Sequence, residues 1–308
     1  MKIRIGTRGS ALALAQSNDV ARRLTACGHE PEIVVISTEG DRVVDRSFIE
    51  VGAFGVFVRE IESALLSGAV DVAVHSYKDL PSRAPDGLII GAVPERVDVA
   101  DVLLVRRAAL IAPRGGLPLA EGARVGTSAT RRRALLLSVR PDLEVGLLRG
   151  NVPTRVRALT DGKFDAIVLA AAGLARLARV DGPDRLTLPA DVETVRLDPH
   201  WFVPAPSQGA IALQVREDDA AVRQVVAALD DAMCRRTLRA ERSVLALAEA
   251  GCSLPFGAWC TSDDAGMLTL ITVLGRDDAV VARSTATGDE PDVVAAEAWR
   301  ALAGAARP

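Results

Sequence analysis

Residues 70–81 read VDVAVHSYKDLP, and this stretch decides the class of fold. Its first part, Val70–Val74, is apolar except for Asp71, which predicts a buried strand. The run gives way to a cluster of polar residues, His75–Asp79, and Pro81 disfavours any continuation as a helix. A buried strand that stops at polar side chains is typical of an α/β protein, in which ligands bind at the carboxyl ends of parallel strands.

The residues before this stretch alternate between strand and helix patterns. We expect strands at Lys2–Gly6 and Glu32–Ser37, and helices at Ser10–Ala26 and Val56–Leu66. Apolar residues recur at helical spacing in both helices, so each has one face to bury. This alternation predicts βαβ units and a mostly parallel sheet.

The same pattern restarts in the middle of the chain. We expect strands at Arg124–Gly126, Glu144–Leu148 and Asp165–Leu169, and helices at Thr130–Val139 and Pro153–Leu159. Two short echoes point to an internal repeat, because Ile5–Arg8 resembles Val125–Ser128 and Val70–Val74 resembles Phe164–Val168. These echoes predict two similar α/β domains that face each other across a cleft.

The last part of the chain has a different pattern. Helices at Ala220–Leu229 and Cys234–Glu249 are followed by strands at Met267–Leu274 and Val280–Thr287 and a helix at Asp292–Ala303. Helices followed by antiparallel strands predict a small α+β domain. We therefore expect three domains: residues 1–96 with 204–228, residues 97–203, and residues 229–308.

Composition excludes several classes of protein. The chain has 308 residues, of which 49% are hydrophobic and 25% are charged, so it can bury a core and is not a disordered chain. A net charge of −3 and 3% aromatic residues disfavour a dedicated nucleic-acid binder. Four cysteines without a CxxC pair and three scattered histidines predict neither a structural zinc site nor a disulfide framework.

The start of the chain, MKIRIGTR, lacks the apolar core of a signal peptide. The longest apolar stretch, Ala166–Ala175, is about half as long as the roughly 20 residues that span a bilayer. We therefore expect a cytoplasmic protein with no membrane partner.

Three turns between a strand and a helix are candidate anion sites, because the first amides of a helix and its dipole favour negative charge. Each turn also carries arginines, whose guanidinium groups suit carboxylates and phosphates. The side chains concerned are Arg8 and Ser10 in the first turn, Thr127, Ser128 and Arg131–Arg133 in the second, and Arg149 and Arg155 around Gly150 in the third. The alternative is that these arginines form ordinary solvated surface.

Two further residues could carry chemistry. Asp79, with Lys78 beside it, could place a carboxylate at the floor of a cleft, or it could cap the backbone of a turn. Cys252 lies on a glycine-flanked loop after a long helix, where a thiol is accessible for covalent chemistry. Most cysteines are small buried apolar residues, and that interpretation suits Cys27 and Cys234.

Taken in order, the motifs resemble the porphobilinogen deaminase (hydroxymethylbilane synthase) family over essentially the whole chain. They are GTRGSALALAQ, TEGD, VDVAVHSYKDLP, VGTSATRRRALL, LRGNVPTRVRAL, FDAIVLAAAGLARL, VPAPSQGAIALQ and AGCSLPFGA. Each motif is weak by itself, but the ordered set is specific.

The resemblance implies a fold and an activity. Such proteins have two periplasmic-binding-protein-like, doubly wound α/β domains and a C-terminal α+β domain, whose loop cysteine carries a dipyrromethane cofactor through a thioether. Here that residue is Cys252. They are monomeric transferases of porphyrin and haem biosynthesis that join four porphobilinogen molecules head to tail. Ammonia leaves at each step, water releases hydroxymethylbilane, and a transient hand-over to the next enzyme of the pathway is possible.

The resemblance also implies roles for individual residues. Asp79 matches the catalytic carboxylate, and no metal is expected. The residues matching cofactor-binding positions are Ser76, Lys78, Thr127, Ser128, Arg131, Arg132, Arg149 and Gly150. The residues matching substrate-binding positions are Arg8, Ser10, Arg149, Arg155 and Gln208.

Several positions depart from the family pattern. Residues Gly52–Gly55 read GAFG where many members have GGKG, and Glu50 and Arg59 stand where lysines are often found. Ala129 replaces a common serine, and Pro153 replaces a glycine. The aspartate, the cysteine and the arginines are retained, so we expect an active enzyme. Two alternatives stay open: a non-catalytic anion-binding receptor or sensor, and an inactive homologue that binds tetrapyrrole intermediates.

Overall fold

The computed structural model describes residues 1–37, 58–114, 116–248 and 254–305. Tertiary contacts divide the chain into two units, which we describe in turn. Unit 1 comprises residues 1–97 and 209–236, and unit 2 comprises residues 98–208 and 237–308.

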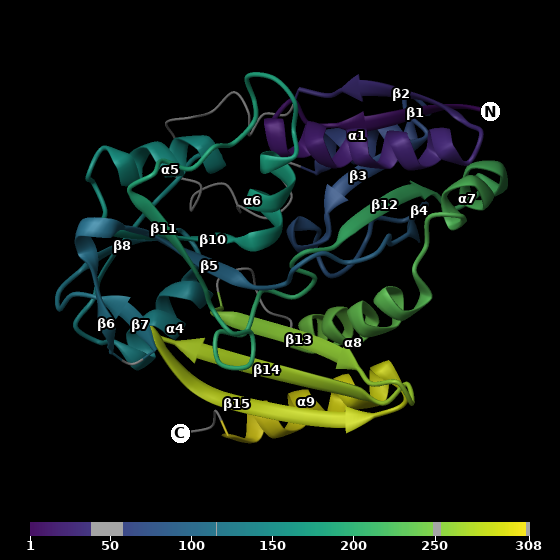
Figure 1. Ribbon diagram of the computed structural model, residues 1–308. Coiled ribbons are helices and arrows are strands. Elements are labelled where there is room, and N and C mark those ends of the chain that lie inside the picture. The colour runs from purple at the N-terminus through teal and green to yellow at the C-terminus, as the bar shows by residue number, and fades with distance from the viewer. Residues whose placement is uncertain (38–57, 115, 249–253, 306–308) are drawn as a thin grey trace. The chain divides into compact units, whose positions relative to one another are not determined.

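Unit 1 is built on a five-stranded sheet with the order β2-β1-β3-β12-β4 (Figure 1). Its strands are β1 (Lys2–Thr7), β2 (Glu30–Val35), β3 (Val72–Ser76), β4 (Leu88–Ala92) and β12 (Ile211–Arg216). β1 pairs in parallel with β2 and β3, whereas β12 runs antiparallel to β3 and β4. The sheet is therefore mostly parallel, as predicted, with one antiparallel strand.

Helices cover both faces of this sheet. Among the described residues, the helices that flank this sheet are α1 (Ala11–Ala26), α3 (Arg59–Leu66) and α7 (Ala220–Ala227), with a short 3-10 helix η1 (Tyr77–Asp79) after β3. Val20 and Leu24 of α1 share one apolar core with Ile3 and Ile5 of β1. Ile61 and Leu65 of α3 share another with β3 and β4. Coverage of both faces is the doubly wound arrangement, and it leaves the carboxyl edge of the sheet for function.

Unit 2 contains a second five-stranded sheet, with the order β11-β5-β10-β8-β9. Its strands are β5 (Asp101–Arg106), β8 (Arg124–Gly126), β9 (Glu144–Gly146), β10 (Ala166–Ala170) and β11 (Val192–Arg196). Its helices are α4 (Thr130–Val139), α5 (Val152–Thr160) and α6 (Ala171–Ala178). A 3-10 turn η2 (Arg107–Ala109) leads from β5 into the hairpin of β6 (Leu110–Arg114) and β7 (Leu117–Leu119).

The two sheets have the same topology. Read from its other end, the second order becomes β9-β8-β10-β5-β11, which matches the first order strand for strand. The registers agree as well: Gly6 pairs with Ala73 in the first sheet, and Gly126 pairs with Ile167 in the second. The similarity of the two α/β repeats, predicted from the sequence echoes, is confirmed.

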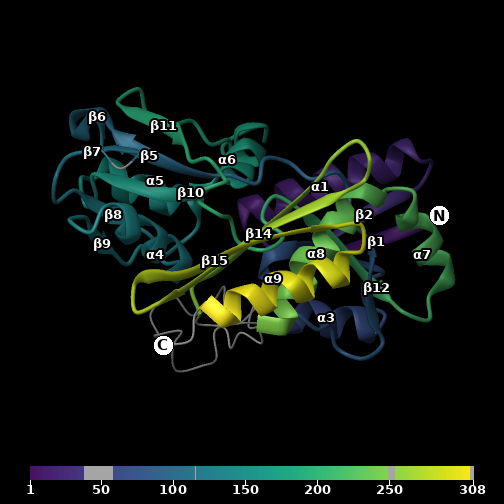
Figure 2. The same cartoon turned by 90° about the horizontal axis from the view of Figure 1, so that it is seen from below.

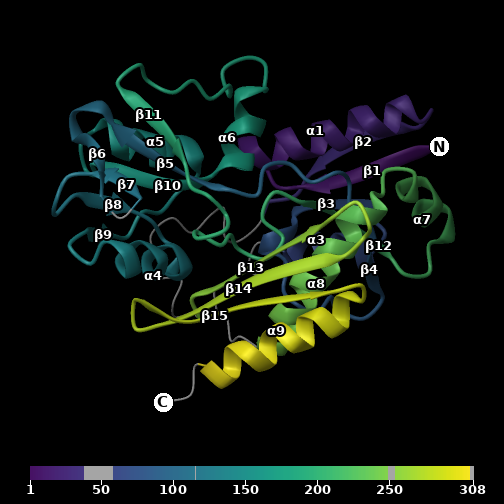
Figure 3. The ribbon, with the colours of Figure 1, turned by 60° about the horizontal axis from the view of Figure 1, so that its bottom comes forward.

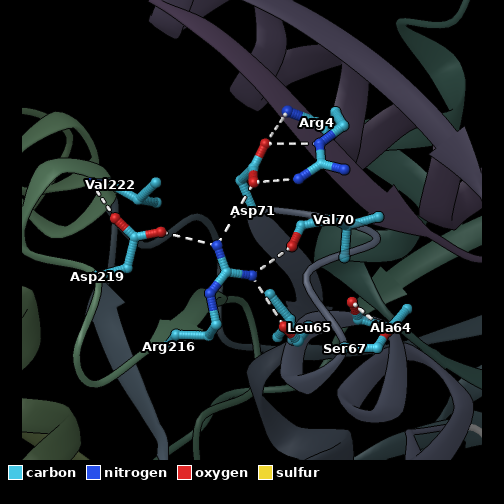
Figure 4. Close-up of polar contacts among 9 residues, drawn as sticks. All are labelled: Arg4, Ala64, Leu65, Ser67, Val70, Asp71, Arg216, Asp219 and Val222. Carbon is cyan, nitrogen blue, oxygen red and sulfur yellow. Dashed lines mark hydrogen bonds and ion pairs between the residues drawn. The ribbon is translucent and has the colours of Figure 1, made fainter.

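One Arg–Asp contact occurs in both units where the parallel strands begin, and Figure 4 shows the one in unit 1. Asp71, just before β3, accepts hydrogen bonds from the backbone N–H of Arg4 at 2.9 Å and from its guanidinium at 2.7 and 3.0 Å. Arg216 lies 3.5 Å from the same carboxylate. In unit 2, Asp165 accepts from the backbone N–H of Arg124 at 2.9 Å. This edge is opposite to the one where β3 ends in polar residues, so the contact holds the strands in register without occupying the candidate site.

Residues 254–305 add a three-stranded antiparallel sheet, β13 (Phe256–Ser262), β14 (Leu268–Arg276) and β15 (Ala279–Gly288). Helices α8 (Ala232–Ala248) and α9 (Pro291–Ala305) complete this part (Figures 2 and 3). Side chains of β14 alternate between two cores of unit 2. Leu268 and Leu270 pack with α9, and Val273 packs in the core that contains Phe202. The helices and the strands β14 and β15 appear as predicted, whereas β13 was not predicted. The three-domain division stays a prediction.

Some sequence expectations differ in detail. The strand expected at Glu32–Ser37 lies at Glu30–Val35, and the strand expected at Val70–Val74 runs instead through Val72–Ser76. The interpretation of Cys27 as a buried residue was wrong, because it is exposed as the C-cap of α1, whereas Cys234 is buried. Within the described residues, every helix is too short or too polar to cross a membrane.

Candidate functional site

The polar end of β3 carries Asp79. The strand stops at Ser76, and η1 follows at once, held by a hydrogen bond of 3.0 Å from the Tyr77 N–H to the Ala210 carbonyl. Asp79 ends this turn with an exposed side chain, and Lys78 beside it is half-buried. The turn therefore presents a carboxylate and an ammonium group at the carboxyl edge of the unit 1 sheet.

The neighbouring strand brings the first anion turn to the same edge. Arg8 directly follows β1 and is half-buried, and Ser10 is the N-cap of α1, accepting the Ala13 N–H at 3.3 Å. The buried Gln16 of α1 reaches across to Ser76, with its amide nitrogen 2.8 Å from the hydroxyl. Arg8, Ser10 and Ser76, all predicted as site residues, thus lie at one end of two adjacent strands.

A buried polar chain lies behind this edge. The Nε2 of His75 is 3.0 Å from the Gln214 amide oxygen, and the amide nitrogen of Gln214 donates to Glu62 at 3.0 Å. Burial lowers the pKa of His75 to about 4, although the hydrogen bond with Gln214 acts in the opposite direction. His75 is therefore a neutral imidazole at physiological pH and donates from Nε2 to the amide oxygen.

The second anion turn opens α4 in unit 2. Thr127 is buried and its hydroxyl accepts the Ala129 N–H at 3.2 Å, while Ser128 is exposed. Ala129 occupies the N-cap position with an extended backbone, and its methyl group cannot accept a hydrogen bond from the first helical amides. Arg131 and Arg132 lie in that first turn, where the helix dipole favours negative rather than positive side chains.

Both arginines converge on Asp101, the first residue of β5. The Arg131 guanidinium donates to one carboxylate oxygen at 2.8 Å, and Arg132 donates to the other at 2.7 and 3.1 Å. Each also donates to a backbone carbonyl, Arg131 to Val203 at 2.7 Å and Arg132 to Val168 at 2.9 Å. The arginines are about 5% exposed and Asp101 is fully buried, so we call these three residues the Asp101 cluster.

Charge is not balanced within the Asp101 cluster. Two guanidinium groups share one carboxylate, so a buried positive charge is left over beside the amides of a helix N-terminus. Burial alone raises the pKa of Asp101, but Arg131 and Arg132 hold the pKa well below its ordinary value. Burial also disfavours the charged form of Arg131, which lowers the pKa of its guanidinium group. A second carboxylate would complete this cluster electrostatically.

Gln208 contacts the Asp101 cluster. Its amide nitrogen donates to Asp101 at 2.9 Å and to the Val99 carbonyl at 2.8 Å. The sequence indicated Gln208 as a substrate-binding residue, and the structure engages its amide with Asp101. A direct contact of Gln208 with substrate stays a prediction.

The third anion turn opens α5. Arg149 is exposed, and Gly150 has a φ of +102°, a left-handed conformation in which an added Cβ would lie 2.9 Å from Thr154. Asn151 is the N-cap and accepts the Thr154 N–H at 3.0 Å, and Arg155 donates back to the Gly150 carbonyl at 2.7 Å. A bulkier residue than glycine at position 150 would disturb the start of this helix.

Several predicted residues lie outside the described part of the chain. These are Cys252, Glu50 and the Gly52–Gly55 segment. Of the other departures from the family pattern, Arg59 is exposed at the start of α3 and Pro153 lies in the first turn of α5, a position that suits proline. The other predicted site residues lie at the carboxyl edge of the sheet of their own unit or around Asp101. Those of unit 1 are Arg8, Ser10, Ser76, Lys78 and Asp79, and those of unit 2 are Thr127, Ser128, Arg131, Arg132, Arg149, Gly150, Arg155 and Gln208.

Sequence reasoning missed two residues of this site. Asp101 begins the apolar run DVLLVR, and a charged residue at the start of such a run is a signal of a paired, buried carboxylate. Gln16 ends the motif GTRGSALALAQ and was not predicted as a site residue, although its spacing places it on the face of α1 that is buried against the sheet.

Fold and site together define a class, the duplicated α/β proteins with arginine-rich turns at the carboxyl edges of their sheets. Within that class, residues 3–224 match the family described as "Porphobilinogen deaminase, dipyromethane cofactor binding domain", and the chain belongs to this family. A porphobilinogen deaminase of Bacillus cereus is 42% identical over 300 residues, which are 96% of this chain and 93% of that protein. One of Syntrophobacter fumaroxidans is 47% identical over 278 residues, 90% of this chain and 85% of that protein.

Among solved structures, a periplasmic substrate-binding protein from Coxiella burnetii is similar with a TM-score of 0.42 and 17% identity. The match covers 76% of this chain and 94% of that one.

The described residues fit the dipyrromethane cofactor of the family. Its pyrrole rings carry acetate and propanoate groups, and the Asp101 cluster offers a buried excess of positive charge beside uncapped helical amides. An aliphatic or cationic group would leave that charge uncompensated. The residues present thus match a ligand that brings carboxylates.

Proposed function

We propose that this chain is a transferase that joins four porphobilinogen molecules head to tail and releases hydroxymethylbilane by hydrolysis. One ammonia leaves for each porphobilinogen added. The proposal is carried by one observation beyond family membership: two buried guanidinium groups at the start of α4 share a single carboxylate. Such a site selects ligands rich in carboxylates, as porphobilinogen and its oligomers are.

The cofactor, when bound through Cys252, supplies the free pyrrole α-carbon to which the first substrate is joined. Asp79 is the residue to which we assign proton transfer, because it is an exposed carboxylate at the end of β3. In each addition the C–N bond of the porphobilinogen aminomethyl group breaks, ammonia leaves, and a C–C bond forms from the methylene carbon to the free pyrrole α-carbon, which then loses its proton. A carboxylate beside the reacting atoms moves these protons and stabilises positive charge on the pyrrole nitrogens.

The remaining residues hold carboxylates and orient the rings. We assign Arg131 and Arg132 to the cofactor, with added hydrogen bonds from the hydroxyl or backbone groups of Ser76, Thr127 and Ser128. The other assigned cofactor-binding residues are Ser76, Lys78, Thr127, Ser128, Arg149 and Gly150. The assigned substrate-binding residues are Arg8, Ser10, Arg149, Arg155 and Gln208. Arginine forks suit this work because they bind carboxylates in two places at once.

Three further assignments belong to the same proposal. We infer a monomer, a cytoplasmic location, and transient hand-over of the product to the next enzyme of tetrapyrrole synthesis.

Turnover of porphobilinogen by variants of Asp79 tests the proposed function. We expect Asp79→Asn to lower the rate of porphobilinogen consumption at least 100-fold, in line with the loss of a general acid–base group. Its intact mass should equal that of the wild type apart from the substitution, because Cys252 is untouched. Asp86→Asn, a change at an exposed aspartate of the same unit, should retain the wild-type rate. Wild-type turnover by Asp79→Asn would refute the assignment.

A further inference from the structure

Ser207 has an unusual backbone conformation. Its φ is +63°, in the left-handed region that L side chains with a Cβ rarely adopt. The other non-glycine residues with positive φ among those described, Asp277 and Asp278, lie in the tight β14–β15 turn, where such values are common. Ser207 is instead fully buried, in the loop that follows β11 along the chain. Strain at a buried position persists only where surrounding contacts enforce it.

The side chain of Ser207 does not explain this conformation. Its hydroxyl is buried, and within the described part of the chain it makes no hydrogen bond. A buried hydroxyl without a partner is itself unfavourable. The reason for the conformation therefore lies in the backbone.

The backbone of Ser207 is held by Glu241. One oxygen of this fully buried carboxyl group accepts the Ser207 N–H at 2.7 Å. The other oxygen accepts the Cys260 N–H of β13 at 2.8 Å. Glu241, on α8, thus connects the Ser207 loop to the C-terminal sheet through two backbone hydrogen bonds inside unit 2.

The residue after Ser207 is Gln208, which donates to Asp101. The polar path therefore runs from Cys260 through Glu241 to Ser207 and Gln208, and from there to Asp101 and its two arginines. A change in the backbone of Ser207 would turn the Gln208 side chain away from Asp101, because the direction of a side chain follows the backbone dihedrals of the loop that carries it.

We propose that Glu241 is a positioning residue, which holds Ser207 in the left-handed conformation and thereby sets Gln208 and Asp101 so that Arg131 and Arg132 face the cofactor carboxylates. This inference rests on the proposed function. It assigns to Glu241 and Ser207 an effect on cofactor loading although neither residue is expected to touch the cofactor.

A purely structural role for Glu241 is the alternative, since its bond to Cys260 also braces β13. The two roles differ in how they respond to glycine at position 207. Glycine adopts positive φ without strain, so a glycine at position 207 should keep the loop conformation without the hydrogen bond to Glu241. It should not compensate for the loss of the hydrogen bond from the Cys260 N–H of β13 to Glu241.

The test measures the fraction of chains that carry the added mass of the cofactor after apo-protein is incubated with porphobilinogen for a fixed time. We expect Glu241→Gln to lower this fraction at least fivefold. We expect the double variant Ser207→Gly/Glu241→Gln to recover to within twofold of Ser207→Gly alone. Glu297→Gln, the same chemical change at an exposed position of α9, serves as the matched control and should load like the wild type.

A second variant keeps the proposal testable if Glu241→Gln does not fold. Ser207→Thr retains Glu241 and its bond to Cys260 but adds a β-branch that disfavours positive φ. It should also lower loading at least fivefold, with thermal unfolding measured alongside to confirm a folded chain.

Three results would overturn the proposal. Wild-type loading by Glu241→Gln or by Ser207→Thr would overturn positioning alone, with the proposed function intact. A loss in Glu241→Gln that Ser207→Gly does not recover would assign Glu241 to bracing β13. Absence of loading in the wild type itself would overturn the proposed function, and the positioning role with it.

Discussion

Asp101 shows how one buried carboxylate organises a binding site. It accepts hydrogen bonds from Arg131, Arg132 and Gln208, which come from a helix and a loop that are far from it in sequence. Alone, the two arginines would repel each other and the positive end of the α4 dipole. The carboxylate of Asp101 offsets the repulsion between the two guanidinium groups. One positive charge remains uncompensated and can bind an anionic ligand.

Removing that carboxylate should therefore destabilise the fold. We expect Asp101→Asn to lower the free energy of unfolding by about 3–5 kcal/mol, because two guanidinium groups would be left buried without a counter-ion. Urea denaturation measures the change. Glu193→Gln removes the partner of the exposed Arg107 and should cost at most about 1 kcal/mol. Equal, small effects of the two substitutions would contradict the burial argument.

His75 gives stability a dependence on pH. Its pKa is about 4 in the folded chain and 6.5 for an ordinary imidazole, so the unfolded chain takes up the proton first as pH falls. Stability is unaffected above pH 6.5 and decreases from there down to about pH 4.

The His75→Gln variant should lack this contribution. Between pH 7 and pH 5 we expect the wild type to lose about 2 kcal/mol more unfolding free energy than the variant. The comparison uses the pH slope of urea denaturation for each protein, because carboxylates shared by both cancel. Parallel slopes would show that His75 is not a buried neutral imidazole.

At the scale of elements, helix caps distinguish the anion turns. The starts of α1 and α5 are capped by the side chains of Ser10 and Asn151, whereas α4 begins after Ala129. The uncapped helix is the one with two arginines and a buried carboxylate in reach. Its first amides are thus available to a ligand rather than to a side chain.

Adding a cap to α4 should stabilise the apo-protein. We expect Ala129→Ser to raise the free energy of unfolding by about 0.5–1 kcal/mol, since the backbone of residue 129 already has the extended geometry of an N-cap. Asn151→Ala should lower it by about 1 kcal/mol by removing the cap of α5. Thermal denaturation of both variants checks the signs, and a loss on Ala129→Ser would show that the helix start has no room for a hydroxyl.

The elements that sequence could predict are those defined by local patterns. The helix at Thr130–Val139 and the short strand at Arg124–Gly126 were predicted to the residue, and the C-terminal helix to within two residues at each end. Strands β5 and β12 were not predicted, because each is a short apolar run whose place in a sheet depends on pairing with residues far along the chain. Asp101 was missed with β5, because its position at the start of the run DVLLVR becomes a signal of burial only once that run is recognised as a strand.

At the scale of the whole molecule, the duplication of the α/β unit was predictable, and the antiparallel direction of β12 and β5 was not. The echo between Ile5–Arg8 and Val125–Ser128 placed β1 and β8 at matching positions of the two sheets. The reversed direction of β12 and β5 arises from long connections, which leave no periodic signature. Arg131 and Arg132 were identified from the second anion turn and Gln208 by resemblance, but their convergence on one carboxylate needed the folded chain.

Whether this fold holds a covalent dipyrromethane on Cys252 can be read from the intact mass of the purified chain. We expect the wild type to carry the added mass of two linked pyrrole units and Cys252→Ser to lack it. A wild-type chain that stays unmodified, even after incubation with porphobilinogen, would contradict this expectation and favour a protein that binds carboxylates without catalysis.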